Sequence, residues 1–159
     1  MSNFRIVPLS TAYAARIREN KKDDFGHEVV AQSATGYGPC RVSLRPFVPG
    51  EDTRLLFSHS PFEINNAFNQ PGPIFIHQRA VRAYEDVHRF PPEIKADPIH
   101  FPLSLIGYNT QQEMVFTRLV KDDDVDALIS EIFAQHQKVA YLHARNAEAG
   151  CFICRIDRA

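Results

Sequence analysis

The chain has 159 residues, of which 44% are hydrophobic and 23% are charged, and its net charge is −1. A near-neutral chain has no overall positive field to attract nucleic acid or an acidic membrane surface, and no apolar run reaches the ~20 residues that a membrane helix needs. The N-terminus also lacks the basic and apolar segments of a signal peptide. We therefore expect a single cytoplasmic domain over residues 1–159, without nucleic-acid or membrane partners.

The first part of the chain predicts two short strands separated by a helix. Residues 4–9 form an apolar run that Pro8 interrupts. Ser10 is a typical N-cap residue, and the helix that it starts should extend to about Asn20. After a charged loop, residues 28–31 have the composition of a second short strand.

The segment 36–47 combines turn-forming residues, a thiol and two arginines within twelve positions. Its glycines and proline precede Cys40 and predict a shaped turn there. From Cys40 onward apolar and polar residues alternate, which is the period of a strand. Because residues 48–52 are a strong turn signal, we expect residues 40–47 and 53–58 to pair as an antiparallel hairpin.

The middle of the chain has a weaker pattern. Residues 60–73 contain three prolines and no clear periodicity, so they predict a long irregular loop of the kind that often carries function. Residues 74–77 should form a short strand that leaves this loop. We expect a helix over residues 79–87, followed by a second irregular stretch over residues 88–100.

The last third of the chain is the clearest. Residues 101–108 and 114–120 predict two paired strands, and apolar residues spaced at helical intervals predict a helix over residues 125–133. Residues 138–145 and 151–157 predict a final hairpin. Because strands occur in consecutive pairs, we predict an α+β fold with a mainly antiparallel, curled sheet and two or three helices.

The three cysteines do not suggest a disulfide framework, because their number is odd. Cys151 and Cys154 have a Cys-x-x-Cys spacing, but they fall in a predicted strand. Strand positions three apart point to opposite faces with Cα atoms ~10 Å apart, whereas a disulfide needs them within about 7 Å. We therefore expect both residues to be free thiols.

Three arginines form the leading candidate for a ligand site. Arg41, Arg45 and Arg145 all lie in the distinctive segments of the chain, and guanidinium groups match the geometry of carboxylates and phosphates. The leading hypothesis is therefore a module that binds a small anionic molecule near the loop 60–73. The alternative is that these arginines form ordinary surface ion pairs with Glu51 or Glu63.

Two other functions compete with this hypothesis. The chain could be an enzyme of unassigned reaction, with Cys40 as the nucleophile and His77 as the base that activates it. The plainer interpretation of these two residues is a buried thiol and a histidine that hydrogen-bonds the backbone. A third hypothesis is a structural protein that forms homodimers through exposed edge strands.

The sequence predicts neither a metal nor a cofactor. None of the seven histidines has the His-x-His or His-x-x-x-His spacing of metal ligands. Gly-rich phosphate-binding loops and the nucleophile elbow of hydrolases are also missing from the sequence.

Four segments together resemble the bacterial family called domain of unknown function 1203. These segments are residues 38–51, 72–77, 107–109 and 145–152. The resemblance implies a single-domain, soluble bacterial protein and assigns no activity. Members of the family often have a cysteine at the position of Val81 and sometimes one at the position of Ser43, which with Cys40 and His77 would suggest a zinc site. This chain lacks both additional thiols.

Overall fold

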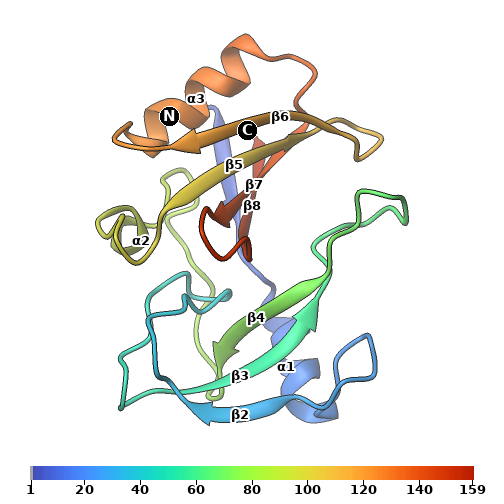
Figure 1. Ribbon diagram of the computed structural model, residues 1–159, viewed down its shortest axis with the longest axis vertical. Coiled ribbons are helices and arrows are strands. Elements are labelled where there is room, and N and C mark those ends of the chain that lie inside the picture. The colour runs from blue at the N-terminus through green and yellow to red at the C-terminus, as the bar shows by residue number, and fades with distance from the viewer. Residues whose placement is uncertain (1) are drawn as a thin grey trace.

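The computed structural model describes residues 2–159, which fold into two antiparallel sheets and three helices (Figure 1). The larger sheet has the strand order β1-β8-β7-β5-β6, and the smaller sheet has the order β2-β3-β4. The predicted α+β class and antiparallel pairing are confirmed, with the strands divided between two sheets. The elements are β1 (Phe4–Val7), α1 (Thr11–Asn20), β2 (Val30–Ser33), β3 (Thr53–His59), β4 (Gly72–His77), α2 (Pro92–Lys95), β5 (Leu103–Tyr108), β6 (Met114–Val120), α3 (Val125–Gln135), β7 (Tyr141–Asn146) and β8 (Phe152–Arg158).

Helix α3 covers the face of the larger sheet that is turned away from the smaller sheet (Figure 1). The helix begins after Asp124, whose side chain accepts a hydrogen bond from the Ala127 N–H at 3.0 Å. Its apolar stripe packs on alternate residues of the central strands, as helical and strand periodicity require. This core includes Leu105, Leu128, Ile129, Ile132, Phe133, Leu142, Ala144 and Ile156.

The smaller sheet has its own core, which it shares with α1. The Ser10 hydroxyl caps this helix as predicted, because it accepts a hydrogen bond from the Tyr13 N–H at 3.0 Å. Ala14 and Ile17 of the helix are fully buried. They belong to a cluster with Cys40, Val42, Leu55, Phe57, Ile74 and Ile76.

The predicted hairpin of residues 40–47 with residues 53–58 is wrong. Strand β3 pairs with β2 and β4, and residues 41–43 form a turn. The Leu44 N–H donates to the Cys40 carbonyl at 2.9 Å, and Leu44 has a φ of 52°, which no extended strand adopts. Val42 and Leu44, the apolar residues of this pattern, are buried, but Val42 lies in the core of the smaller sheet and Leu44 in the core beneath α3.

The predicted helix over residues 79–87 is also wrong, since this segment has no regular structure. The Tyr84 N–H donates to the Val42 carbonyl at 2.9 Å, so the segment hydrogen-bonds across to the turn that follows Cys40. A long-range backbone contact has replaced local helical hydrogen bonds. The short helix α2 forms only afterwards, with Pro92 at its first turn.

The other predicted elements match the structure closely. The loop over residues 60–73 is irregular up to Gly72, and the final hairpin forms between β7 and β8. Strand β2 lies two residues later than expected. All three cysteines are free thiols. Within residues 2–159, no helix combines the length and apolar character that crossing a membrane would demand.

Candidate functional site

A pocket of about 580 Å³ lies where the two sheets face each other. Its walls come from the smaller sheet, the end of the loop 60–73, and the turn between β7 and β8. Its volume is in the range of small-molecule sites. The residues that line it, all within the described part of the chain, include no Asp or Glu: Gly38, Arg41, Leu56, His59, Gln70, Pro71, Gly72, Pro73, Ile74, Phe75, Arg145, Ala149, Gly150, Cys151 and Phe152.

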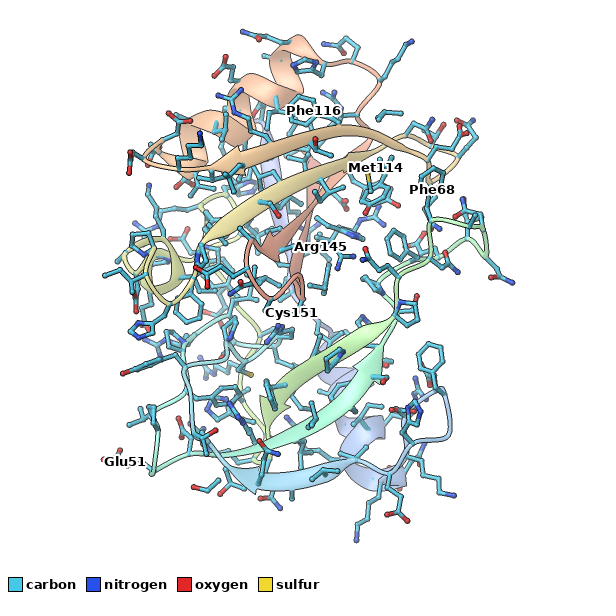
Figure 2. The ribbon with its side chains drawn as sticks, in the orientation of Figure 1. Glu51, Phe68, Met114, Phe116, Arg145 and Cys151 are labelled. Carbon is cyan, nitrogen blue, oxygen red and sulfur yellow. The ribbon has the colours of Figure 1, made fainter. Side chains whose placement is uncertain are left out.

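Arg145 enters this pocket from the end of β7 and is only 7% exposed. Its Nη1 donates to the Gly150 carbonyl at 3.1 Å, but the buried Nε and Nη2 have no hydrogen-bond partner. The positive charge of Arg145 opposes the rise in the pKa of Tyr108 that burial causes. The Tyr108 hydroxyl nevertheless leaves Nε and Nη2 of Arg145 without a hydrogen-bond partner. Figure 2 shows Arg145 and Cys151 on the side of the larger sheet that faces the smaller sheet.

Arg41 is the second cation in the pocket, and it is 1% exposed. Its Nε donates to the Phe152 carbonyl at 2.8 Å, and its Nη1 donates to the Pro39 carbonyl. Burial lowers the pKa of Arg41, but a guanidinium keeps its proton in proteins. Among the described residues, neither Arg41 nor Arg145 forms an ion pair with an acidic side chain. The pocket therefore holds two guanidinium groups that no carboxylate of the described residues pairs with.

His59 and Cys151 are further polar groups at the pocket. Burial lowers the pKa of His59 to about 4, although the charge of Asp24 opposes this shift. The His59 Nδ1 lies 3.1 Å from the Tyr13 hydroxyl. Cys151 contributes a half-buried free thiol to the pocket. The pocket thus offers two cations, an imidazole and a thiol to a ligand.

Arg45 lies outside this pocket. Its side chain is 69% exposed and forms an ion pair with Glu93 at 2.9 Å. The turn at residues 41–43 directs Arg41 inward and leaves Arg45 on the surface. Of the three arginines predicted to form a site, the structure brings together Arg41 and Arg145 only. Glu63, one of the acidic partners considered from the sequence, is 3.4 Å from Arg155 instead.

Cys40 and His77 form a second polar cluster, at the far end of β4. Both are buried, with Cys40 at 0% and His77 at 5% exposure. Burial raises the pKa of the Cys40 thiol, but hydrogen bonds from the side chains and backbones of His77 and Ser43 outweigh it, and the pKa falls to about 6. Hydrogen bonding with Cys40 in turn raises the pKa of His77. This contact is a loose one, because Nδ1 of His77 has no partner at ordinary hydrogen-bond geometry.

Asp52 completes this cluster, and sequence reasoning missed it. Its Oδ2 lies 3.5 Å from the His77 Nε2 and accepts a hydrogen bond from the Val48 N–H at 2.7 Å. That backbone hydrogen bond is the main reason why the pKa of Asp52 is lowered. The sequence did identify the turn at residues 48–52 that contains Asp52. Only the pairing of β3 with β4 brings this turn beside His77.

The cluster does not form a metal site. Within residues 2–159, no three His, Cys, Asp or Glu side chains are grouped closely enough to hold a metal ion. Ser43 and Val81, which lie beside this cluster or four residues after His77, have no thiol, and neither side chain is a strong metal ligand.

The fold and these two sites define an α+β protein with two antiparallel sheets and an arginine-lined pocket between them. The family model described as Protein of unknown function (DUF1203) matches residues 37–158, so the chain belongs to this family. The resemblance found from the sequence motifs is thus confirmed. No curated protein and no solved structure matches the chain.

Proposed function

We propose that this protein binds a small anionic molecule in the pocket between the two sheets. The observation that carries this proposal is the state of Arg145, a buried cation with two unpartnered nitrogens and no acidic neighbour. Burying an unpaired charge is costly, and proteins normally pair it. An anionic ligand would supply the missing partner.

The pocket indicates the chemical class of this ligand. Two guanidinium groups favour a carboxylate or phosphate group, which can accept several N–H donors at once. The walls contributed by Leu56, Ile74 and Phe75 are apolar. The best fit is therefore a small organic acid or phosphate ester whose charged end meets Arg145 and whose remainder contacts these walls.

Thermal-shift measurements with a panel of simple carboxylates and phosphates test the proposal. A ligand that binds only the folded chain stabilises it by about 2.7 kcal/mol at a concentration of 100 times its Kd. We expect at least one anion of the panel to raise the Tm of the wild-type protein, with a Kd confirmed by calorimetry.

The Arg145→Met variant should lose this shift while keeping the fold. Methionine fills much of the same volume without a charge, so removing the unpaired cation should leave the Tm unchanged or raise it. Arg45→Met is the matched control, because Arg45 is an exposed cation outside the pocket, and it should respond to anions like the wild type. The proposal fails if no anion shifts the wild-type Tm at millimolar concentration, or if both variants still respond.

The cytoplasmic location and the homodimer stay predictions from the sequence. Exposed apolar side chains on the edge strand β6 support the homodimer, since Met114, Val115 and Leu119 are between 41% and 50% exposed. Sedimentation velocity at two protein concentrations would test for this association.

A further inference from the structure

We propose that the pocket between the two sheets selects an anion that also carries a hydroxyl group, and that His59 accepts a hydrogen bond from this hydroxyl. The inference rests on the proposed function, in which Arg145 and Arg41 hold the charged end of the ligand. It adds a second recognition element, which is an imidazole whose tautomer and orientation are set by Tyr13.

His59 is the last residue of β3 and lines the same pocket as the two arginines. Phe152 connects the three side chains. It is the cross-strand partner of Arg145, and its carbonyl accepts a hydrogen bond from the Arg41 Nε at 2.8 Å. Its ring centroid is 6.1 Å from that of the His59 imidazole. The imidazole and the guanidinium groups thus border one residue, which places them within the span of a single small ligand.

The hydrogen bonds behind His59 determine which of its ring nitrogens carries the proton. The Tyr13 hydroxyl donates to the Asp24 Oδ2 at 3.3 Å and lies 3.1 Å from the His59 Nδ1. An ionised carboxylate only accepts, and a hydroxyl has a single proton to donate. Because the Tyr13 proton goes to Asp24, the tyrosine oxygen accepts from the Nδ1–H of His59. The other nitrogen, Nε2, is then a hydrogen-bond acceptor.

The neighbouring groups hold this chain of hydrogen bonds in place. The Arg16 guanidinium donates to the Asp24 Oδ1 at 2.9 Å, which is the main reason why the pKa of Asp24 is lowered. The rings of Tyr13 and His59 meet edge to face, with centroids 5.1 Å apart. Burial raises the pKa of Tyr13 to about 12 and lowers that of His59 to about 4. Asp24 is therefore ionised at neutral pH, while Tyr13 and His59 are uncharged.

His59 is accessible to a ligand, unlike the other histidine on this side of the larger sheet. Both ring nitrogens of His143 are sealed from solvent without a partner. His59 is only half-buried and forms part of the pocket wall. Because Tyr13 occupies Nδ1, Nε2 is the ring nitrogen that His59 offers to a molecule in the pocket.

The charges of the pocket select the kind of donor that His59 receives. A hydroxyl and an ammonium group can both donate a hydrogen bond to Nε2. The lining includes two guanidinium groups and, among the described residues, no Asp or Glu, so an ammonium group would meet only like charge. A hydroxyl donates without carrying charge. We therefore assign the ligand to the hydroxylated anions, which are hydroxy carboxylic acids and hydroxylated phosphate esters.

The test is isothermal titration calorimetry with ligands that differ in one kind of group. Malate, succinate and aspartate carry a hydroxyl, a hydrogen and an ammonium group at the same carbon. Glycerol phosphate and propyl phosphate form the corresponding pair of phosphate esters. In at least one pair, we expect the hydroxylated member to bind with a Kd about five times lower, which is the order of effect of one hydrogen bond. The pair that shows this preference identifies a carboxylate or a phosphate as the charged group.

Variants of the intact protein assign the preference to His59. His59→Phe keeps an aromatic ring and removes the acceptor, so the two Kd values of the pair should become equal. His100→Phe is the matched control, because His100 is an exposed histidine that pairs with Asp97 outside the pocket, and it should keep the wild-type ratio.

Tyr13 is a positioning residue, and its role has a spectroscopic signature. Tyr13→Phe removes the oxygen that accepts from Nδ1, so the preference for the hydroxylated ligand should fall part of the way. Nitrogen NMR of the histidine rings should show the His59 proton on Nδ1 in the wild type and a mixture of tautomers in Tyr13→Phe. A purely structural role for Tyr13 would leave the tautomer unchanged.

Three results would overturn the inference: equal binding of the members of both pairs, tighter binding of aspartate than of malate, or a wild-type His59 with its proton on Nε2. The proposed function survives each of them if Arg145→Met abolishes the anion binding that the wild type shows. Failure of every anion to bind would instead reject both proposals. If a variant does not fold, the wild-type ligand series and the wild-type NMR spectrum still decide the matter.

Discussion

The two faces of the larger sheet differ in chemistry although both are buried. On β7, Leu142 and Ala144 point to the apolar core beneath α3, whereas Tyr141, His143 and Arg145 point to the side of the smaller sheet. None of these five residues is more than 8% exposed. The same strand therefore supports a conventional core on one face and a buried polar surface on the other.

The comparison shows which face serves stability and which face is available for function. The α3 face is packed mainly with apolar side chains, as close-packed cores are. The opposite face leaves polar atoms unpaired, including both ring nitrogens of His143 and two nitrogens of Arg145. Unsatisfied buried polar groups lower stability, so we interpret this face as the functional one.

The largest effect should come from the apolar face. Leu142→Ala should lower the free energy of unfolding by about 2–5 kcal/mol, because it removes buried methyl groups and leaves a cavity. Urea denaturation measures this loss. Leu119→Ala is the matched control on the exposed edge strand β6, where Leu119 is 50% exposed, and it should change stability by no more than about 0.5 kcal/mol. A loss below about 1 kcal/mol for Leu142→Ala would show that the two faces do not differ in this way.

His143 provides the second prediction, which concerns pH. Burial lowers the pKa of this histidine to about 2, in a cage where the rings of Phe62, Tyr108 and Phe152 have centroids 4.9 to 5.0 Å away. Between pH 6.5 and pH 2 the His143 imidazole is protonated in the unfolded chain but stays neutral in the folded chain. Stability is therefore complete above pH 6.5 and falls as the pH falls, by about 2 kcal/mol at pH 5 for this residue.

The His143→Leu variant should lose this share of the acid sensitivity. It should also be more stable than the wild type at pH 7 by about 1 kcal/mol, because it removes two unpaired buried nitrogens. Denaturant unfolding at several pH values measures both effects. An unchanged pH dependence, or a large loss of stability at pH 7, would mean that the imidazole has a partner that stabilises the fold.

The smallest effect should come from the exposed cation Arg45. Arg45→Ala should change the free energy of unfolding by less than about 1 kcal/mol, because its ion pair with Glu93 lies in solvent. A double-mutant cycle with Glu93→Ala measures the pair directly. A coupling above about 2 kcal/mol would show that the surface pair supports the fold, and the contrast between Arg45 and the buried arginines would weaken.

The sequence predicted best where local rules and tertiary contacts agree. The N-cap Ser10 and the apolar stripe of α3 depend on neighbouring residues, so their patterns predicted these elements correctly. The segments 40–47 and 79–87 were predicted wrongly because their backbones hydrogen-bond to distant segments. The Arg41 N–H donates to Phe75, and the Tyr84 N–H donates to Val42.

The sequence by itself determined the α+β class and the candidate site residues, because composition, turn signals and periodicity are properties of short stretches. Cys40, His77, Arg41 and Arg145 were all candidates on these grounds. Only the tertiary structure decided their grouping. The pairing of β3 with β4 brings Asp52 to His77, and the facing of the two sheets brings Arg41 to Arg145 while the turn after Cys40 leaves Arg45 on the surface. Such convergence depends on contacts between residues far apart in the chain, which no local pattern of side chains specifies.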